Sequence, residues 1–456
     1  MVKPTIILAT SNGIGMGHLA RATAIASAMQ EFATPVIVSV AGGIAEIPSA
    51  TGIRCEYIPG KTRGWMPRSK WDTYFRDRLV AIAQETGARI IAFDGVVPYP
   101  GFIATKLVNP ELDIVWIRRG MWQRNLLRFV LPFQSQLVDR VIEPGDFARG
   151  YDLGPTAHRS EGILTAPVSL FQKDKALSRA EARKILGLDS IRPAVLVQLG
   201  TGESDVNEKM TAALCGLIGW KDLQVVLTKD PVDKNGASLV PEGLDIRVVR
   251  HFPLAQVLRA FDASVCATGY NGVHELLPAQ VPTVFVSNIR GTDDQEARAK
   301  WCHDMGFAIR ADQADLQNIT NAVKKLQHSQ IRERLHQQCA HLPDPVGGAE
   351  IAKILYELAC KTGMSRPGPM NRLKRLLLWG VLRRAALIYR TINPHKVENL
   401  VHSENPIWGS QNTAEELAPL IKGTIRFEHL ITGASENYIR RRREIAHSAY
   451  GTRSPS

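Results

Sequence analysis

Short runs of β-branched and other apolar residues alternate, along the first third of the chain, with longer stretches in which apolar residues recur every three or four positions. Such runs predict β-strands, and such stretches predict amphipathic helices. Strands are expected at 5–10, 35–40, 89–93, 113–117 and 138–142, and helices at 18–30 and 71–85. This alternation is typical of a parallel, doubly wound sheet.

The same alternation starts again at Pro193. Strands are expected at 194–199, 223–228, 246–249, 264–267 and 283–286, and helices at 205–217, 272–278 and 294–305. The fold class is therefore predicted to be α/β, with two Rossmann-like domains and a cleft between them. A last helix, at 349–360, follows a break that contains Pro and Gly and can fold back across that cleft.

The length of 456 residues is about three times that of a typical single domain. We expect an N-terminal Rossmann-like domain at 1–166, a linker at 167–192, a C-terminal Rossmann-like domain at 193–361 and an extension at 362–456. In the linker, Ser178 and Glu181 have the spacing of a capping box, which predicts a short helix that ends at Gly187.

The extension differs from the rest of the chain in charge. It holds 15 Lys and Arg against 7 Asp and Glu, and so carries +8 of the net charge of +12. A helix at 372–390 would have arginines on one side and apolar residues opposite. Two interpretations stay open: peripheral contact with a membrane surface, or packing on the protein's own core with the arginines in water.

Composition and charge also limit the partners and the location. Hydrophobic residues at 45% and charged residues at 22% exclude a disordered, collagenous or coiled-coil chain. A basic run at 438–443 leaves nucleic acid as an alternative partner, but no helix-turn-helix, finger or RRM pattern supports it, so none is expected. Six cysteines without a C-x-x-C pair and an N-terminus without a signal-peptide core favour a cytoplasmic protein, at most at the inner face of the cell membrane.

The first predicted strand leads into a loop, 11–18, that has glycines at alternate positions and stands directly before a helix. Such a loop lets the backbone approach a ligand closely, and the helix start offers unpaired N–H groups. A dinucleotide site is the alternative, but the glycine spacing differs from that fingerprint and no acidic residue follows the second strand.

Two residues near this loop are candidate catalytic groups. His18 directly follows the glycines, and its imidazole can take a proton from an acceptor hydroxyl or serve as a cap or packing residue. Asp94 ends a predicted strand, at the edge where the carboxyl ends of parallel strands lie. It can orient His18, contact the acceptor or cap a turn.

The second half carries a longer ordered motif. The strand at 264–267 leads into a Gly-rich turn and a helix start, which can bind a diphosphate through backbone N–H groups. Glu275, one turn into that helix, can accept hydrogen bonds from a ribose diol. Asp294 and Gln295, at the next strand-to-helix junction, can bond sugar hydroxyls. The order and spacing of these pieces predict a nucleotide-sugar site.

This combination resembles the GT-B fold glycosyltransferases and is similar to glycosyltransferase family 28, whose type member is the lipid-intermediate N-acetylglucosaminyltransferase of peptidoglycan synthesis. The resemblance covers about residues 1–361. It implies inverting, metal-independent transfer of a hexose or N-acetylhexosamine from a UDP-sugar to a cell-surface glycan or lipid-linked acceptor, without a further cofactor. It implies His18 as the base, with Asp94 beside it. The donor-binding residues that we expect are Gly15, Gly17, Thr201, Phe252, Gly269, Tyr270, Asn271, Gly272, Glu275, Asp294 and Gln295.

The chain departs from the family pattern at three places. Ala267 stands where the related signature usually has His, Arg298 stands where it has Asn, and the first loop lacks the Gly-Gly-Thr-Gly-Gly-His form. The substrate of the type member is therefore not assigned. No Asp-x-Asp triplet occurs, so no metal is expected. A nucleotide-sugar epimerase or hydrolase on the same fold is the alternative enzyme.

Two stretches that mix basic and aromatic residues lie in the first half, at 61–71 and 118–133. They can bind a lipid-diphosphate acceptor or a bilayer surface. The alternatives are a solvated loop for the first stretch and a core helix for the second.

Overall fold

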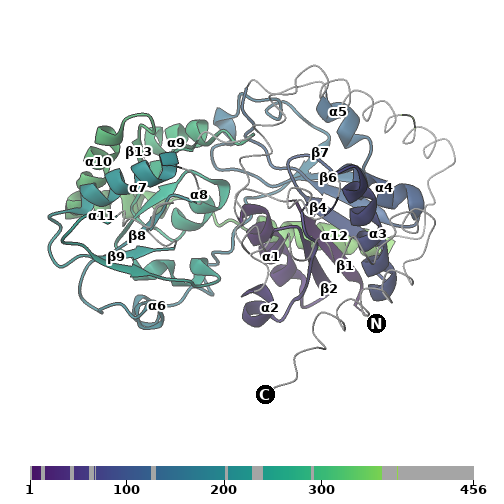
Figure 1. Ribbon diagram of the computed structural model, residues 1–456, viewed down its shortest axis with the longest axis horizontal. Coiled ribbons are helices and arrows are strands. Elements are labelled where there is room, and N and C mark those ends of the chain that lie inside the picture. The colour runs from purple at the N-terminus through teal and green to yellow at the C-terminus, as the bar shows by residue number, and fades with distance from the viewer. Residues whose placement is uncertain are drawn as a thin grey trace.

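The computed structural model describes residues 3–11, 16–41, 46–60, 66, 68–124, 130–200, 204–228, 240–288, 292–361 and Leu377. Two parallel sheets lie side by side, each covered by helices on both faces (Figure 1). The predicted α/β class with two Rossmann-like units is confirmed. Apart from Leu377, the helix expected at 372–390 and the basic run at 438–443 lie outside the described residues.

The N-terminal sheet has seven strands in the order β3-β2-β1-β4-β5-β6-β7. Their bounds are Thr5–Thr10 (β1), Thr34–Ser39 (β2), Arg54–Tyr57 (β3), Ile90–Asp94 (β4), Asp113–Ile117 (β5), Arg140–Glu143 (β6) and Gly162–Leu164 (β7). Neighbouring residues of a strand point to opposite faces. Ile7 and Phe93 therefore pack with helices α3 (Arg68–Thr86) and α4 (Pro100–Val108), and Leu8 packs on the other face.

The C-terminal sheet has six strands in the order β10-β9-β8-β11-β12-β13. Their bounds are Ala194–Gln198 (β8), Gln224–Leu227 (β9), Asp245–Val248 (β10), Ala263–Ala267 (β11), Thr283–Val286 (β12) and Ile309–Ala311 (β13). One face packs on α7 (Ser204–Leu217) and α10 (Leu316–Lys324). The other packs on α6 (Arg179–Leu186), the 3₁₀ helix η3 (Leu254–Ala260) and α8 (Tyr270–Leu276).

The predicted elements are present with boundaries that differ by at most three residues, and three strands, β1, β5 and β12, have the predicted bounds. The capping box at Ser178 is formed with Glu181, and Gly187 ends α6 in the left-handed conformation. The hydrophobic pattern did not predict several shorter or amphipathic elements. These are β3, β7, β13, α4, α10, α2 (Glu46–Thr51), α5 (Val130–Ser135) and α11 (Ser329–Cys339).

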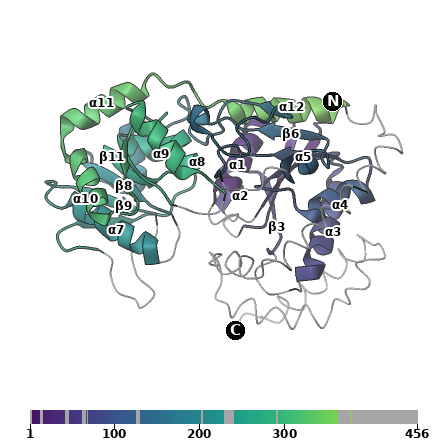
Figure 2. The same ribbon diagram turned by 90° about the horizontal axis from the view of Figure 1, so that it is seen from above.

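The last described helix, α12 (Gly347–Lys361), returns to the N-terminal sheet, as the break before it allowed (Figure 2). It packs beside α1 (Gly17–Met29) and buries Ile351 and Leu355 against that sheet. Its first N–H, that of Gly347, donates to the carbonyl of Pro167 at 2.9 Å. No helix among the described residues has both the length and the apolar character needed to cross a bilayer.

We predict that Gly347→Ala destabilises the protein by about 1–3 kcal/mol, the usual cost of overpacking. A Cβ at Gly347 would lie 1.9 Å from the carbonyl oxygen of Ala166, a backbone atom that cannot rotate away. Urea unfolding measures the effect. Gly150→Ala is the matched control, because nothing lies within 4 Å of the Cβ position there. Equal stability of the two variants would contradict the prediction.

Candidate functional site

The two domains meet through loops that follow the carboxyl ends of their strands. Residues 16–18, 119–123 and 145–147 of the N-terminal domain contact residues 268–275 and 292–298 of the C-terminal domain. We call this set the interdomain junction. In doubly wound folds ligands bind at this edge of the sheet, so the junction is where the predicted site residues should gather.

His18 and Asp94 are in direct contact. His18 lies in the first turn of α1, and Asp94 ends β4, the strand next to β1. His18 Nδ1 lies 2.6 Å from Asp94 Oδ1. Arg21, on the next turn of α1, donates to both carboxylate oxygens, from Nε at 2.9 Å and from Nη2 at 2.7 Å. The contact favours the role for Asp94 in which it orients His18.

The charges around this pair define its protonation. Burial raises the pKa of Asp94, but the charges of Arg21 and His18 and their hydrogen bonds outweigh burial and lower it to about 2. The ionised carboxylate accepts the Nδ1–H of His18, so Nε2 carries no proton. Burial lowers the pKa of His18, and with the repulsion of Arg21 and Arg119 it outweighs the raising effect of Asp94. The imidazole is therefore neutral at pH 7, and Nε2 can accept a proton.

The first turn of α8 is fixed to the N-terminal domain. Tyr270 is 2% exposed, and its hydroxyl donates to the carbonyl of Gly145 at 2.8 Å and accepts from the N–H of Val168 at 2.9 Å. His274 donates from Nδ1 to the Tyr270 carbonyl at 2.7 Å and accepts the N–H of Phe147 on Nε2 at 3.1 Å. Burial lowers the pKa of His274 to about 4, so the ring is neutral. The Tyr270 hydroxyl thus joins the domains, and the contact of this residue with a nucleotide-sugar donor stays a prediction.

The next predicted donor residue, Asn271, also reaches the other domain. Its Nδ2 donates to the carbonyl of Gly17 at 3.3 Å, directly before His18. Its buried Oδ1 has no hydrogen-bond partner among the described residues. Gly272 serves packing, because a Cβ there would lie 2.9 Å from Cys266 Sγ, whereas nothing lies within 4 Å of a Cβ at Gly269.

Glu275 lies on the following turn of α8 and is partly buried. Burial raises its pKa to about 8, and no cation among the described residues forms an ion pair with it. A carboxylate that is withdrawn from water without a charged partner is destabilised in the free protein. Hydroxyl groups of a bound ligand could supply the missing hydrogen bonds.

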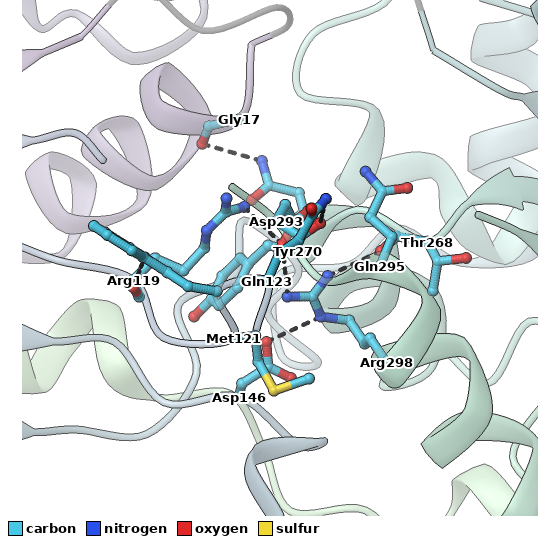
Figure 3. A network of polar contacts seen from close by, with 12 residues as sticks. Gly17, Arg119, Met121, Gln123, Asp146, Thr268, Tyr270, Asp293, Gln295 and Arg298 are labelled. Carbon is cyan, nitrogen blue, oxygen red and sulfur yellow. Dashed lines mark hydrogen bonds and ion pairs between the residues drawn. The ribbon is translucent and has the colours of Figure 1, made fainter. Parts of the chain in front are cut away.

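Arg298 is the centre of the polar network at the junction (Figure 3). Its side chain is fully buried and donates three hydrogen bonds, each 3.0 Å long. Nε bonds Asp146 Oδ2 of the N-terminal domain, Nη1 bonds the Thr268 carbonyl, and Nη2 bonds Asp293 Oδ1. Burial lowers the pKa of Arg298, but Asp146 and Asp293 raise it more, so the guanidinium stays charged. The residue that departs from the family pattern therefore connects the domains.

Backbone contacts add to this network. The carbonyl of Met121 accepts the N–H of Asp294 at 2.9 Å, and the N–H of Gln123 donates to the carbonyl of Thr292 at 2.8 Å. Met121 has a φ of 58°, which is uncommon for a residue other than glycine. Asp152 fixes this conformation, because its Oδ2 accepts the Met121 N–H at 3.0 Å.

The predicted sugar-binding pair, Asp294 and Gln295, lies at the start of α9 (Gln295–Asp304). Asp294 is the N-cap, and its Oδ1 accepts the N–H of Ala297 at 3.0 Å. Gln295 Oε1 accepts the N–H of Asn288 at 2.9 Å, and its side chain also bonds Asp293. Both side chains are partly engaged within the protein, and their contact with a sugar stays a prediction.

The other predicted residues are more scattered. Phe252 packs against the hydrophobic cluster of the N-terminal domain that α1 and α12 cover. Gly15 and Thr201 lie outside the described residues, as does most of the loop at 61–67. In the stretch 118–133, Arg118 is buried and paired with Glu143 and Glu161, so this arginine does not face a ligand.

The sequence did not single out several residues of the junction. Arg21 follows His18 by three residues, and that spacing on a helix was a usable indication. Arg119 belongs to the basic and aromatic stretch 118–133, but nothing in the sequence distinguished it there. Asp146 and Asp293 had no indication, because their partners are distant in sequence. Among the described residues, no group of three or more His, Cys, Asp or Glu is placed to hold a metal ion.

Comparison with known proteins identifies the lineage. No family model matches the chain. The UDP-N-acetylglucosamine–N-acetylmuramyl-(pentapeptide) pyrophosphoryl-undecaprenol N-acetylglucosamine transferase of Nocardioides sp. is 32% identical over 239 residues, which cover 50% of this chain and 60% of that enzyme. The enzymes of the same name from Frankia casuarinae and Rhodococcus opacus are 25% and 24% identical and are covered over 95% and 99% of their lengths.

Solved structures show the same fold. The glycotransferase of kitacinnamycin superposes with a TM-score of 0.54 at 16% identity, over 78% of this chain and 99% of that one. A putative UDP-N-acetylglucosamine 2-epimerase from Listeria monocytogenes superposes with a TM-score of 0.53 at 12% identity, over 80% and 99%. The chain thus has the GT-B fold and is distantly related to the N-acetylglucosaminyltransferases of family 28.

Proposed function

We propose that the protein transfers a hexose or N-acetylhexosamine from a UDP-sugar to a glycan or lipid-linked acceptor, with inversion and without a metal. One observation carries the proposal. Asn271, in the segment expected to bind the donor, donates to the carbonyl of Gly17, the residue before His18. The candidate base and the candidate donor segment are therefore adjacent, as a direct transfer between two substrates requires.

The donor side rests on Glu275 and the strand-to-helix turn before it. Its carboxyl group lacks a cation among the described residues and would accept hydrogen bonds from the ribose hydroxyls. Gly269, with open space at its Cβ position, would let the diphosphate approach the backbone. The names of the bacterial relatives, which give UDP-N-acetylglucosamine as their donor, support a UDP-sugar.

The acceptor side rests on His18 and Asp94. In the proposed step an acceptor hydroxyl oxygen attacks the anomeric carbon, its proton passes to His18 Nε2, and the bond from that carbon to the diphosphate breaks. Asp94 would stabilise the imidazolium that forms, through the Nδ1–H bond. Backbone N–H groups would stabilise the leaving diphosphate.

We further propose that the reaction takes place at the cytoplasmic face of the membrane, with residues 372–390 in peripheral contact. The names of the relatives support this, since they give an undecaprenol-linked acceptor for those enzymes. A nucleotide-sugar epimerase or hydrolase stays the second candidate, because a putative epimerase shares the fold. Incubation of the UDP-sugar without acceptor separates them: an epimerase or hydrolase consumes it, whereas a transferase is nearly idle.

We predict that His18→Ala keeps UDP binding but lowers turnover about 10²- to 10⁴-fold, the usual contribution of a general base. The wild-type rate should fall only below pH 6.5, because the pKa of His18 is lowered and its neutral form is the active one. Calorimetric titration with UDP and a radiolabelled transfer assay measure the two effects. His303→Ala, at an exposed histidine, is the control. Unchanged turnover in His18→Ala would contradict His18 as the general base, and Asp94 would then be the next candidate.

We predict that Glu275→Gln weakens UDP binding about tenfold at pH 9, where the carboxyl group is ionised and the change removes a charge-assisted hydrogen bond. The same change should stabilise the unliganded protein at high pH. Burial raises the pKa of the folded carboxyl to about 8 from an ordinary value near 4.5, so its ionisation costs stability as pH rises between these values. Above pH 8 the full cost applies to the wild type and not to the variant. Thermal unfolding from pH 5 to pH 9 measures it.

Glu208→Gln is the matched control for this prediction, since Glu208 is exposed on α7 and changes the net charge equally. A Glu275→Gln variant that binds UDP like the wild type would contradict the ribose contact. Failure of the wild type to bind any nucleoside diphosphate would contradict the proposed function itself.

A further inference from the structure

Arg118 and Arg119, two adjacent arginines that follow β5, differ in burial and in ion pairing. Arg118 is fully buried, pairs with Glu143 at 2.9 Å and Glu161 at 2.6 Å, and lies over the ring of Trp116. Arg119 lies at the interdomain junction, where its side chain is 15% exposed (Figure 3). Arg118 therefore stabilises the N-terminal domain, whereas Arg119 contacts the C-terminal domain at the junction.

Arg119 is poorly paired for a cation in this position. Among the described residues, Asp293 is the carboxylate within ion-pair distance, and Arg119 Nη1 lies 3.4 Å from its Oδ1. The same oxygen accepts the Nη2 of Arg298 at the shorter distance of 3.0 Å, and Asp293 also bonds Gln295. If Arg119 turned to another partner, Asp293 would keep its bonds to Arg298 and Gln295. Arg119 can therefore exchange this contact without leaving Asp293 unpaired.

The charges nearby act differently on the three arginines of the junction. Arg21 and Arg298 have raised pKa values, because the carboxylates that they bond outweigh burial. The pKa of Arg119 is lowered: burial is the largest cause, the attraction of Asp293 opposes it, and the repulsion of Arg21 and Arg298 adds to it. An anion bound beside Arg119 would relieve this repulsion.

Arg119 also lies close enough to His18 to lower the pKa of its imidazole. A group held by Arg119 would thus be near the proposed base and near Asp293, next to the proposed sugar contacts. A guanidinium can bond a phosphate through two parallel N–H groups.

We infer that Arg119 binds the diphosphate of a substrate at the junction. This inference rests on the proposed function, which supplies two molecules of that chemistry: the UDP-sugar donor and a lipid-diphosphate acceptor. Arg119 exchanges its weak contact with Asp293 for the phosphate oxygens, and Arg298 keeps Asp293 in place. The occupied site places the diphosphate next to His18.

The test compares the full-length wild type, Arg119→Gln, Arg119→Lys and Arg124→Gln by calorimetric titration. The probes are inorganic pyrophosphate, UDP and geranyl diphosphate. Arg124 is exposed in the same segment, so Arg124→Gln makes the same charge change without the junction. We expect Arg119→Gln to weaken pyrophosphate binding about 10- to 100-fold, the loss of a charge-assisted contact, and Arg124→Gln to change it less than about twofold. Arg119→Lys should lie between them, because it keeps the charge and loses the paired donors.

UDP and geranyl diphosphate show which substrate supplies the diphosphate that Arg119 binds. A loss confined to UDP assigns Arg119 to the donor, and a loss confined to geranyl diphosphate assigns it to the acceptor. Pyrophosphate binding that depends on Arg119 in a protein that does not bind UDP supports the inference and contradicts the proposed donor. Normal UDP binding with no effect of Arg119→Gln on any probe overturns the inference and leaves the donor proposal standing. A wild type that binds none of the three probes overturns both.

Thermal unfolding without ligand excludes a merely structural role. Arg119→Gln should melt no lower than Arg124→Gln, because it removes a cation whose charged form is disfavoured by burial. Pyrophosphate should then raise the melting temperature of the wild type and not that of Arg119→Gln. A lower melting temperature of unliganded Arg119→Gln, with pyrophosphate affinity unchanged, would show that the residue serves folding and would overturn the inference.

Discussion

The buried guanidinium of Arg298 is the interaction on which the arrangement of the two domains depends. It is bonded to Asp146 in one domain and to Asp293 and the Thr268 carbonyl in the other, with no exposed surface. Removing one partner of a buried pair typically costs about 3–5 kcal/mol, because the remaining charge stays out of water. The segment 292–298, which holds the predicted sugar contacts Asp294 and Gln295, is thus fixed relative to the domain that carries His18.

The junction distributes its carboxylates unequally among its arginines. Arg21 pairs with Asp94, and Arg298 pairs with Asp146 and Asp293. Arg119 contacts Asp293 Oδ1, an oxygen that it shares with Arg298. Glu275 is the acidic counterpart, with a pKa raised to about 8 by burial. Groups whose charged form is disfavoured in the free protein cluster at functional sites, where a bound ligand supplies the missing charged or hydrogen-bonding partner. On this view the unfavourable electrostatics of Arg119 and Glu275 mark where a substrate binds.

The alternation of strands and helices was enough to predict both sheets, because their central strands are buried on both faces and form short apolar runs. Strands of three residues, such as β7 and β13, escape that pattern. The contact between His18 and Asp94 followed from topology, since β1 and β4 are neighbours and both residues lie at their carboxyl ends. The role of Arg298 could not be predicted, because Asp146 is 152 residues away. Tyr270 was expected at the donor, and its hydroxyl bonds the other domain, a contact that the turn motif does not reveal.

The polar character of the junction bears on how substrates enter. A substitution at Arg298 leaves a charge buried, whereas separation of the domains exposes Arg298, Asp146 and Tyr270 to water together. Water then replaces each lost hydrogen bond, and such an exchange changes the free energy by about 0.5–1.5 kcal/mol for a neutral bond and about 1.5–3 kcal/mol for a bond to a charged group. An apolar contact of the same extent would lose its stabilisation on opening without such replacement. A junction built from buried ion pairs and backbone hydrogen bonds can therefore be specific when closed and still open at moderate cost, which suits an enzyme that must admit two substrates between its domains.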